Sequence, residues 1–302
     1  MILRNFDELI GVAKVRGRRR VAVALAEDEL VLKGMKLAWD EELVSPVLFG
    51  NERRISALIK KLGLPEEWEI MHVDGDDATV AMQAVQSVKR GETELLMKGQ
   101  MHTATLFSAV LNKKEGMEHA SILSHIAFVE VPGYKKLFGT TDGGLNLAPS
   151  FDQKVKIVQN TVNAFHHLGY VSPKIGLLSY VEKVKANDPE TGDWAKITEM
   201  AKAGEFGEAT IDGPFGFDLC LSQEAKEIKN CKSEVAADVD AIVAPNITAC
   251  NASTKALVLR GGLGAGIVVG AAVPIVALSR GDSPRTRLCS IATGIAMLGH
   301  KD

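Results

Sequence analysis

The feature that most constrains the fold of this chain is an alternation of short apolar runs with helical stretches. Residues 21–25 and 46–50 are almost continuously apolar, which is typical of strands covered on both faces. Residues 55–62 follow with apolar side chains at helical spacing and with Asn51 placed to cap the helix. Because strand and helix keep alternating, the sequence predicts parallel sheets with helices on both faces. In such sheets ligands bind beyond the carboxyl ends of the strands, so polar residues at those ends matter most.

Two segments depart from this alternation. Residues 126–131 and 137–141 are β-rich and are separated by Pro132 and Gly133, which predicts a hairpin. The apolar stretch 261–278 is broken by glycines and by Pro274, so it predicts a buried pair of strands and not a membrane span. Its Gly-rich start lacks the third glycine of a dinucleotide-binding loop, and we interpret it as a close-packed connection.

The bulk composition bounds the class of protein. A chain of 302 residues, 46% hydrophobic, is long enough for about two domains. A net charge of -3 gives no global reason to expect nucleic acid or an anionic membrane as a partner. The cysteines have no zinc-site spacing and no signal peptide is visible, so we expect reduced thiols in a cytoplasmic protein.

The segment Ser279–Ser283 carries the sharpest chemical signal. It follows a predicted strand, 274–278, and precedes a helical pattern from about residue 285. Free N–H groups and the helix dipole favour an anion at such a place, and the fork of Arg280 can grip phosphate. The alternative interpretation is a polar turn with a capping serine.

Several strand ends, taken in order, resemble one family. They are Leu96–Gly99 with 102–104, Leu123–Ile126 with 129–132, Thr141–Asn146, Val181–Val184, Asp212–Pro214, Ser233–Ala236, Pro245-Asn246, Asn251, Lys255 and Ser279-Arg280. This order is similar to the phosphate acetyl/butyryl transferase family, and within it to the butyryltransferases. The resemblance extends from about residue 10 to the C-terminus.

The resemblance implies a fold and a reaction. The fold would be α/β, with two three-layer αβα domains of the isocitrate/isopropylmalate dehydrogenase type and a cleft between them. We expect residues 1–133 and 268–302 in the first domain and 134–267 in the second. The reaction would be acyl-CoA plus phosphate giving acyl phosphate plus CoA, as in short-chain fatty acid metabolism. Coenzyme A and phosphate are then substrates, no cofactor is needed, and a homodimer is implied.

The resemblance also implies catalytic roles. Arg280 would bind phosphate or the carbonyl oxygen, and Ser279 would hydrogen-bond or protonate the departing sulfur. Asp282 would orient Arg280 or act as a base, with capping of the last helix as the alternative. No metal site is expected, because no cluster of His, Asp and Glu has ligand spacing.

Substrate-binding roles are assigned to two further groups of residues. Lys98 would add positive charge at the phosphate site, within the segment that includes Gly99, His102 and Thr103; its alternative is a surface lysine. The remaining residues would line the cleft or the acyl and pantetheine wall: Ser124, His125, Asp142, Asn146, Asn246, Asn251 and Lys255. For His125 a structural role, and for Asp142 and Asn146 simple turn formation, are the alternatives.

Departures from the family bear on the acyl group. Acetyl-specific members place an arginine where this chain has residues 121–123, and their aspartate after Ser-Arg is replaced within 284–287, so the base is unassigned. Cys250 occupies a position where butyryl-type members usually have glycine. It would either alter the acyl pocket or be a buried apolar residue. We therefore favour butyryl-CoA. The alternatives are a phosphate acetyltransferase, a metal- and NAD-dependent hydroxy-acid dehydrogenase, or a non-catalytic CoA-binding protein.

Overall fold

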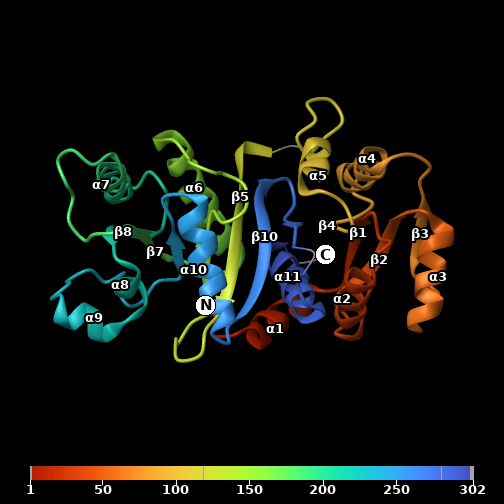
Figure 1. Cartoon of the computed structure of the whole chain (residues 1–302), viewed down its shortest axis with the longest axis horizontal. Coiled ribbons are helices and arrows are strands. Elements are labelled where there is room, and N and C mark those ends of the chain that lie inside the picture. The colour runs from red at the N-terminus through yellow and green to blue at the C-terminus, as the bar shows by residue number, and fades with distance from the viewer. Residues whose placement is uncertain (1, 118, 280, 300–302) are drawn as a thin grey trace. The chain divides into compact units, whose positions relative to one another are not determined.

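The computed structural model describes residues 2–117, 119–279 and 281–299, without the side chains of 119–121 (Figure 1). The chain forms two compact units. Unit 1 comprises Met1–Phe6 and Ser121–Gly264, and unit 2 comprises Asp7–Ala120 and Ala265–Asp302. The boundaries at 120/121 and 264/265 lie before the expected ones at 133/134 and 267/268.

Unit 2 is an open, mostly parallel sheet with flanking helices. Its strands lie in the order β3-β2-β1-β4-β11-β10, and β10 runs antiparallel to β11. In chain order the elements are α1 (Phe6–Arg16), β1 (Arg19–Ala24), α2 (Glu29–Asp40), β2 (Val44–Gly50), α3 (Glu52–Leu62), β3 (Glu69–His72), α4 (Asp77–Lys89), β4 (Leu95–Lys98), α5 (Thr103–Val110), β10 (Leu263–Ala271), β11 (Ile275–Val276) and α11 (Pro284–Met297).

Helices cover both faces of the unit 2 sheet. Helices α4 and α5 pack together on one side, and α2 and α11 pack together on the other (Figure 1). Strand β1 is correspondingly buried along Val21–Ala24. The predicted strand pair in 261–278 is confirmed as β10 and β11. The predicted cap at Asn51 is confirmed as well, because its side chain accepts a hydrogen bond from the first turn of α3, and Asp76 caps α4 in the same way.

Unit 1 has the strand order β5-β6-β9-β7-β8. Strands β5 and β6 are antiparallel, which confirms the predicted hairpin, and the other pairs are parallel. The elements are β5 (His119–Glu130), β6 (Phe138–Thr141), α6 (Phe151–His167), β7 (Lys174–Leu178), α7 (Pro189–Lys202), β8 (Thr210–Phe215), α8 (Phe217–Leu221), α9 (Gln223–Ile228), β9 (Ala241–Val243) and α10 (Ile247–Leu259).

The unit 1 sheet is also covered on two faces. Helices α6 and α7 lie on one face, where Lys154 and Asp193 join them at 2.9 Å. Helices α8 and α10 lie on the other face, over a core that includes Phe138, Ile242 and Cys250. Both units are therefore three-layer αβα structures, as expected.

The boundaries of several elements differ from the prediction. Strand β5, predicted over 126–131, extends over His119–Glu130, and β11, predicted over 274–278, over Ile275–Val276. Helix α7, which the pattern of residues 194–203 predicts from Trp194 onward, begins earlier, at Pro189. Asp188 accepts hydrogen bonds from the first-turn amides, and proline suits the first helical position. The strand expected to end at 213–214 continues to Phe215. Helix α10, over residues 247–259, has no counterpart among the predicted elements.

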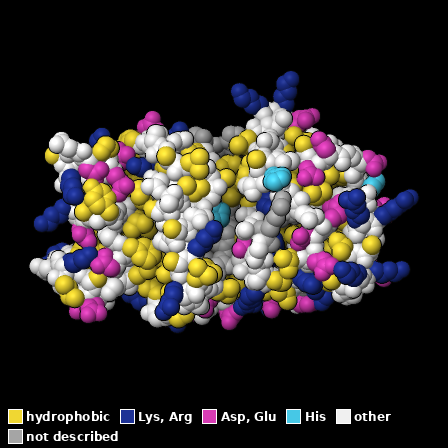
Figure 2. All heavy atoms as spheres, in the orientation of Figure 1, with side chains coloured by type: hydrophobic (Ala, Val, Ile, Leu, Met, Phe, Trp, Pro, Cys, Tyr) yellow, Lys and Arg dark blue, Asp and Glu magenta, His cyan; other side chains and the backbone are white. Residues whose placement is uncertain are grey.

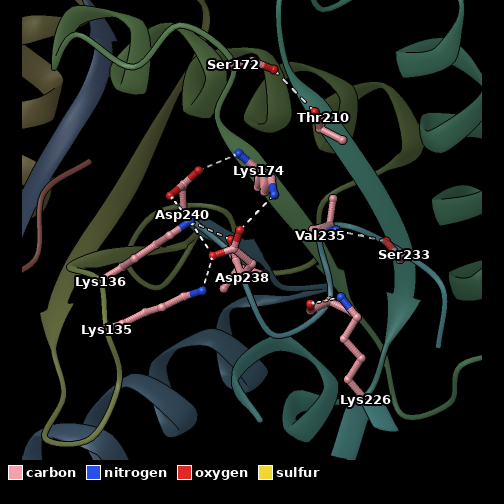
Figure 3. A network of polar contacts seen from close by, with 12 residues as sticks. Lys135, Lys136, Ser172, Lys174, Thr210, Lys226, Ser233, Val235, Asp238 and Asp240 are labelled. Atoms are coloured by element: carbon pink, nitrogen blue, oxygen red, sulfur yellow. Dashed lines mark hydrogen bonds and ion pairs between the residues drawn. The ribbon is translucent and has the colours of Figure 1, made fainter. Parts of the chain in front are cut away.

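A cluster of charged side chains joins the N-terminal ends of three strands in unit 1 (Figure 3). Lys136, just before β6, contacts both Asp238 and Asp240 at 2.9 Å. Lys174, the first residue of β7, contacts Asp238 at 2.8 Å and donates its backbone N–H to Asp240. Asp240 directly precedes β9, so the cluster fixes the starts of β6, β7 and β9 relative to one another.

Two properties of the described residues bear on partners. None of the described helices has the length and apolar character needed to cross a membrane. On the face shown in Figure 2, acidic and basic side chains are interspersed and do not gather by sign.

Candidate functional site

Three strands of unit 2 end at one edge of the sheet. Ala24 of β1 lies beside Lys98 of β4, and Val276 of β11 lies beside Met97. Because these strands are parallel, the segments after them emerge side by side. The register thus brings Lys98 and the residues following β11 to the same edge, as predicted from the sequence.

Lys98 is held inside this edge. Its side chain is only 5% exposed, and Nζ donates to the carbonyl oxygens of Gly99 at 3.3 Å and Met101 at 3.1 Å. The alternative of a surface lysine is therefore wrong. A buried ammonium in contact with backbone oxygens gives this edge a fixed positive charge.

Gly99 allows the loop after β4 to approach the end of β1. A Cβ at Gly99 would overlap the carbonyl oxygen of Leu25, and the Gly99 N–H donates to Ala24 at 2.8 Å. His102 is the exposed N-cap of α5 and makes no side-chain cap bond, and Thr103 is the exposed first residue of that helix.

The loop between β11 and α11 is a tight polar turn. The Ser279 N–H donates to Asp282 Oδ2 at 2.7 Å, and the Asp282 N–H returns a bond of 3.3 Å to the Ser279 carbonyl. The cap of α11 is Ser283, whose Oγ accepts from the Thr286 N–H at 3.1 Å. The interpretation of Asp282 as the cap is thus wrong, because its carboxylate is bound within the turn. Arg280 lies outside the described residues.

Sequence reasoning missed Arg287 beneath this turn. Its side chain is 3% exposed, and Nη2 donates to the Ser279 carbonyl at 3.3 Å. Burial lowers the pKa of the Arg287 guanidinium, while Asp28 and Asp282 raise it. The available signal was its spacing from Ile291 and Ile295, which puts all three on one buried helix face.

In unit 1, Asp142 organises the loop after β6. The carboxylate is 3% exposed and accepts from the N–H groups of Gly144 at 2.8 Å and Leu145 at 2.9 Å. Its other oxygen accepts from Asn146 Nδ2 at 2.6 Å, and Asn146 also donates to the Leu123 carbonyl of β5. The turn-forming interpretation of Asp142 and Asn146 is confirmed, and the turn is tied to the hairpin.

Ser124 and His125 lie on opposite faces of β5. Ser124 is fully buried and accepts a hydrogen bond of 3.1 Å from Asn160 of α6, so its hydroxyl joins the hairpin to that helix. His125 is half-buried and packs against Gly144, where an added Cβ would lie 3.1 Å from its ring. His125 therefore contacts the loop that Asp142 holds, whereas Ser124 faces the interior.

Helix α10 covers the same loop. Asn246 caps the helix by accepting from the Ala249 N–H at 3.0 Å, and Asn251 donates to the Gly143 carbonyl at 3.0 Å. Lys255 is exposed, two turns into the helix. Cys250 is 1% exposed and burial raises its pKa to about 12, so it is a protonated core residue at neutral pH, as its alternative interpretation has it.

A pocket of about 610 Å³ opens in unit 1 at the C-terminal ends of β7 and β8 and beside the start of α10. Lys229 lies in it between Glu182 and Asp218, at 2.5 and 2.8 Å, and the Tyr180 ring is 63% exposed. Besides Asn246 and these four, the lining consists of Leu178, Ser179, Glu190, Gly216, Phe217, Pro245 and Ala249. Apart from Asn246, these residues were not predicted as site residues.

The predicted residues thus form two groups, one in each unit, and all but the exposed Lys255 of α10 lie near one sheet edge of their unit. Unit 2 holds Lys98, Gly99, His102, Thr103, Ser279 and Asp282, and unit 1 holds Ser124, His125, Asp142, Asn146, Asn246, Asn251 and Lys255. Within the part of the chain that the structure describes, no group of three or more His, Cys, Asp or Glu side chains is arranged to hold a metal ion.

Known structures share this fold. A branched-chain phosphotransacylase from Enterococcus faecalis superposes with a TM-score of 0.81 and 29% identity, covering 94% of this chain and all of that one. A structure from Salmonella typhimurium, described as a putative 4-hydroxythreonine-4-phosphate dehydrogenase, gives a TM-score of 0.60 at 13% identity. The match covers 93% of this chain and all of that one. The second likeness shows the fold alone, and it agrees with the expected dehydrogenase-like architecture.

Relatives found by sequence comparison are named as phosphate acyltransferases. The chain is 35% identical to a phosphate butyryltransferase of Clostridium beijerinckii, over 96% of both chains. It is 32% identical to a phosphate acetyltransferase of Thermotoga maritima, over 95% of this chain and 97% of the relative. The chain is accordingly an enzyme, a phosphate acyltransferase. Residues 76–295 match the family model described as phosphate acetyl/butaryl transferase, and the chain belongs to that family.

Proposed function

We propose that the chain transfers a short acyl group, with butyryl favoured, between coenzyme A and inorganic phosphate. A phosphate oxygen attacks the thioester carbonyl, the new C–O bond forms, and the C–S bond breaks. The thiolate of CoA leaves and takes up a proton, and acyl phosphate is the second product. Since the thioester is already activated, the protein needs only to bring two anions together and to stabilise the oxyanion and the thiolate.

The observation that carries this proposal is the shared edge of β4 and β11 in unit 2. There the buried Lys98 ammonium and the turn that begins at Ser279 follow neighbouring strands, next to the N-terminus of α11. Backbone N–H groups at a helix start and fixed positive charge both favour phosphate. We assign phosphate binding to Lys98 and Arg280, and stabilisation of the leaving sulfur to Ser279.

The acyl-CoA is assigned to the edge of unit 1. Asp142 and Asn146 shape the loop, Asn251 and Cys250 pack against it, and Asn246 and Tyr180 line the adjoining pocket. The pocket is lined by three carboxylates and one lysine, so it suits an uncharged part of CoA better than its phosphates. The preference for butyryl rests on the absence of the arginine that acetyl-specific members place before Ser124.

The test is phosphate-dependent release of CoA thiol from acetyl-, propionyl-, butyryl- and isobutyryl-CoA, with arsenate in place of phosphate as a control. We expect turnover with all four and the highest kcat/KM with butyryl-CoA. A higher value for acetyl-CoA would overturn the acyl preference. No release from any of them by folded protein would overturn the transferase proposal and favour a CoA-binding role.

Arg280→Ala tests the assignment of phosphate to the edge of unit 2. Loss of a bidentate contact to phosphate is expected to lower kcat/KM for phosphate by about 100-fold or more, with the circular dichroism spectrum unchanged. Retained turnover would remove Arg280 from the mechanism. Arg285→Ala is the matched control, since Arg285 is exposed and pairs with Asp7 at 2.7 Å.

Three further properties stay proposals. We propose that no resident cofactor or metal takes part, which predicts unchanged turnover after treatment with EDTA and dialysis. We propose a homodimer from the family resemblance, to be measured by sedimentation equilibrium. We propose a cytoplasmic location because the spacing of the cysteines is that of reduced thiols, and Cys220, Cys250 and Cys289 are buried.

A further inference from the structure

Arg287 is a buried cation that forms no ion pair among the described residues. Its side chain is 3% exposed, and Nε has no hydrogen-bond partner among the described residues. None of the described carboxylates lies within ion-pair distance of its guanidinium. Among the described residues of α11, Arg285 is the one that forms an ion pair, with Asp7. A buried guanidinium is ordinarily paired and fully hydrogen-bonded, so this one calls for an explanation.

The position of Arg287 in its helix adds to the cost of burying its positive charge. The residue lies one turn into α11, near the positive end of the helix dipole, where a cation is disfavoured. Asp28 and Asp282 are the acidic groups close enough to favour its charged form, and the carboxylate of Asp282 already accepts from Ser279. An anion arriving at this end of α11 would relieve both the unpaired charge and the unfavourable dipole.

Gly34 of α2 leaves space for the Arg287 side chain next to the turn. A Cβ at Gly34 of α2 would lie 2.6 Å from Arg287 Cβ and 2.9 Å from Cδ, so glycine leaves the slot that the stem of Arg287 fills. From this slot Nη2 reaches the Ser279 carbonyl at 3.3 Å. The Ser279 backbone is thus held from two directions, by Asp282 at its N–H and by Arg287 at its carbonyl.

We propose that Arg287 is a positioning residue of the phosphate subsite, which holds Ser279 from beneath and supplies a buried positive charge that bound phosphate neutralises. This rests on the proposed assignment of phosphate to the Ser279 turn. Arg287 does not act as a base, since a guanidinium stays protonated. The ligand class is a small, multiply charged oxyanion.

The first experiment compares Arg287→Met with the wild type and with Arg285→Met, an equal loss of charge at an exposed position of the same helix. We expect Arg287→Met to raise KM for phosphate about tenfold or more, while KM for the acyl-CoA changes by less than about twofold. Arg287→Lys, which keeps the charge, is expected to recover most of the phosphate affinity. Arg285→Met should leave both constants near the wild-type values.

Binding is measured apart from turnover, by the rise in melting temperature on titration with inorganic phosphate alone. The Kd for phosphate should shift by the same factor as KM. An unchanged phosphate KM and Kd in Arg287→Met, or an equal rise in both KM values, would overturn the proposal and leave Arg287 with a packing role. Absence of phosphate-dependent turnover in the wild type would instead overturn the proposed function.

Gly34→Ala provides the test if Arg287→Met does not fold. The added methyl displaces the stem of Arg287 without removing its charge, at a helical position where alanine is otherwise favourable. We expect a raised phosphate KM, because the stem of Arg287 must move away from the added methyl. A Gly34→Ala enzyme with the wild-type phosphate KM would contradict the positioning role.

Discussion

At the scale of single residues, Asp238 shows how opposing effects fix a charge state. Burial would raise the pKa of this carboxyl, but hydrogen bonds from Lys174 and Lys136 outweigh it and hold the pKa far below its usual value (Figure 3). The folded state therefore binds the proton later than the unfolded chain as the pH falls. The stabilisation is complete above the unfolded pKa of about 4 and is lost below it.

Asp238→Asn is expected to lower the free energy of unfolding at pH 7 by about 2 kcal/mol, because it leaves Lys136 and Lys174 with one carboxylate fewer. The difference from the wild type should narrow as the pH falls below about 4. Urea unfolding at pH 7 and at pH 3.5 measures both. Asp40→Asn, which removes an exposed ion pair with Lys36, should change stability by less than about 0.5 kcal/mol. A pH-independent difference for Asp238→Asn would contradict the linkage.

Gly99 is the second residue whose environment makes a definite prediction. An alanine there would press its Cβ into the Leu25 carbonyl, so Gly99→Ala should cost about 3 kcal/mol of stability and raise KM for phosphate by moving Lys98. Gly11→Ala is the control, since Gly11 lies in α1 with open space around it and alanine should stabilise the helix by about 0.5–1 kcal/mol. Equal effects of the two substitutions on the melting temperature would refute this explanation.

At the scale of elements, the loop after β6 depends on one carboxylate. Asp142 binds two loop amides and Asn146, and Asn146 binds β5, so hairpin and loop form one unit over which α10 packs. The helix start adds Asn251, which donates to Gly143. Removing the carboxylate would leave several buried donors without acceptors.

Asp142→Ala is therefore expected to destabilise unit 1 by about 3 kcal/mol and to speed hydrogen exchange at the amides of Gly144 and Leu145. Acyl-CoA affinity should fall more than phosphate affinity if the loop binds acyl-CoA. The exposed Asp152 provides the control, because its replacement by alanine should leave the exchange of those amides unchanged. Unchanged exchange in Asp142→Ala would show that other contacts hold the loop.

At the scale of the whole molecule, the family assignment predicts which ligands stabilise the fold. Coenzyme A at about 100 times its Kd should raise the free energy of unfolding by about 2.7 kcal/mol, which corresponds to a rise of a few degrees in melting temperature. NAD at the same concentration should give no rise. A shift with NAD and none with coenzyme A would favour the dehydrogenase alternative over the transferase.

Local patterns in the sequence predicted the α/β class, the hairpin, the helix cap at Asn51, and the strand ends at which Lys98, Asp142 and Ser279 lie. These features follow from local periodicity and capping chemistry, which act over a few residues and are visible in any stretch of sequence. The ordered strand ends also identified the family that the comparisons show.

The contacts between side chains of distant elements follow from the tertiary structure and not from local sequence patterns. Ser124 points into the interior because α6 supplies Asn160 as its partner, and Asp282 binds the Ser279 amide while Ser283 caps α11. Arg287 is buried because Gly34, more than 250 residues away in sequence, leaves room for its stem. These contacts depend on packing between elements that are distant in sequence. They cannot be predicted from the spacing of residues along one element.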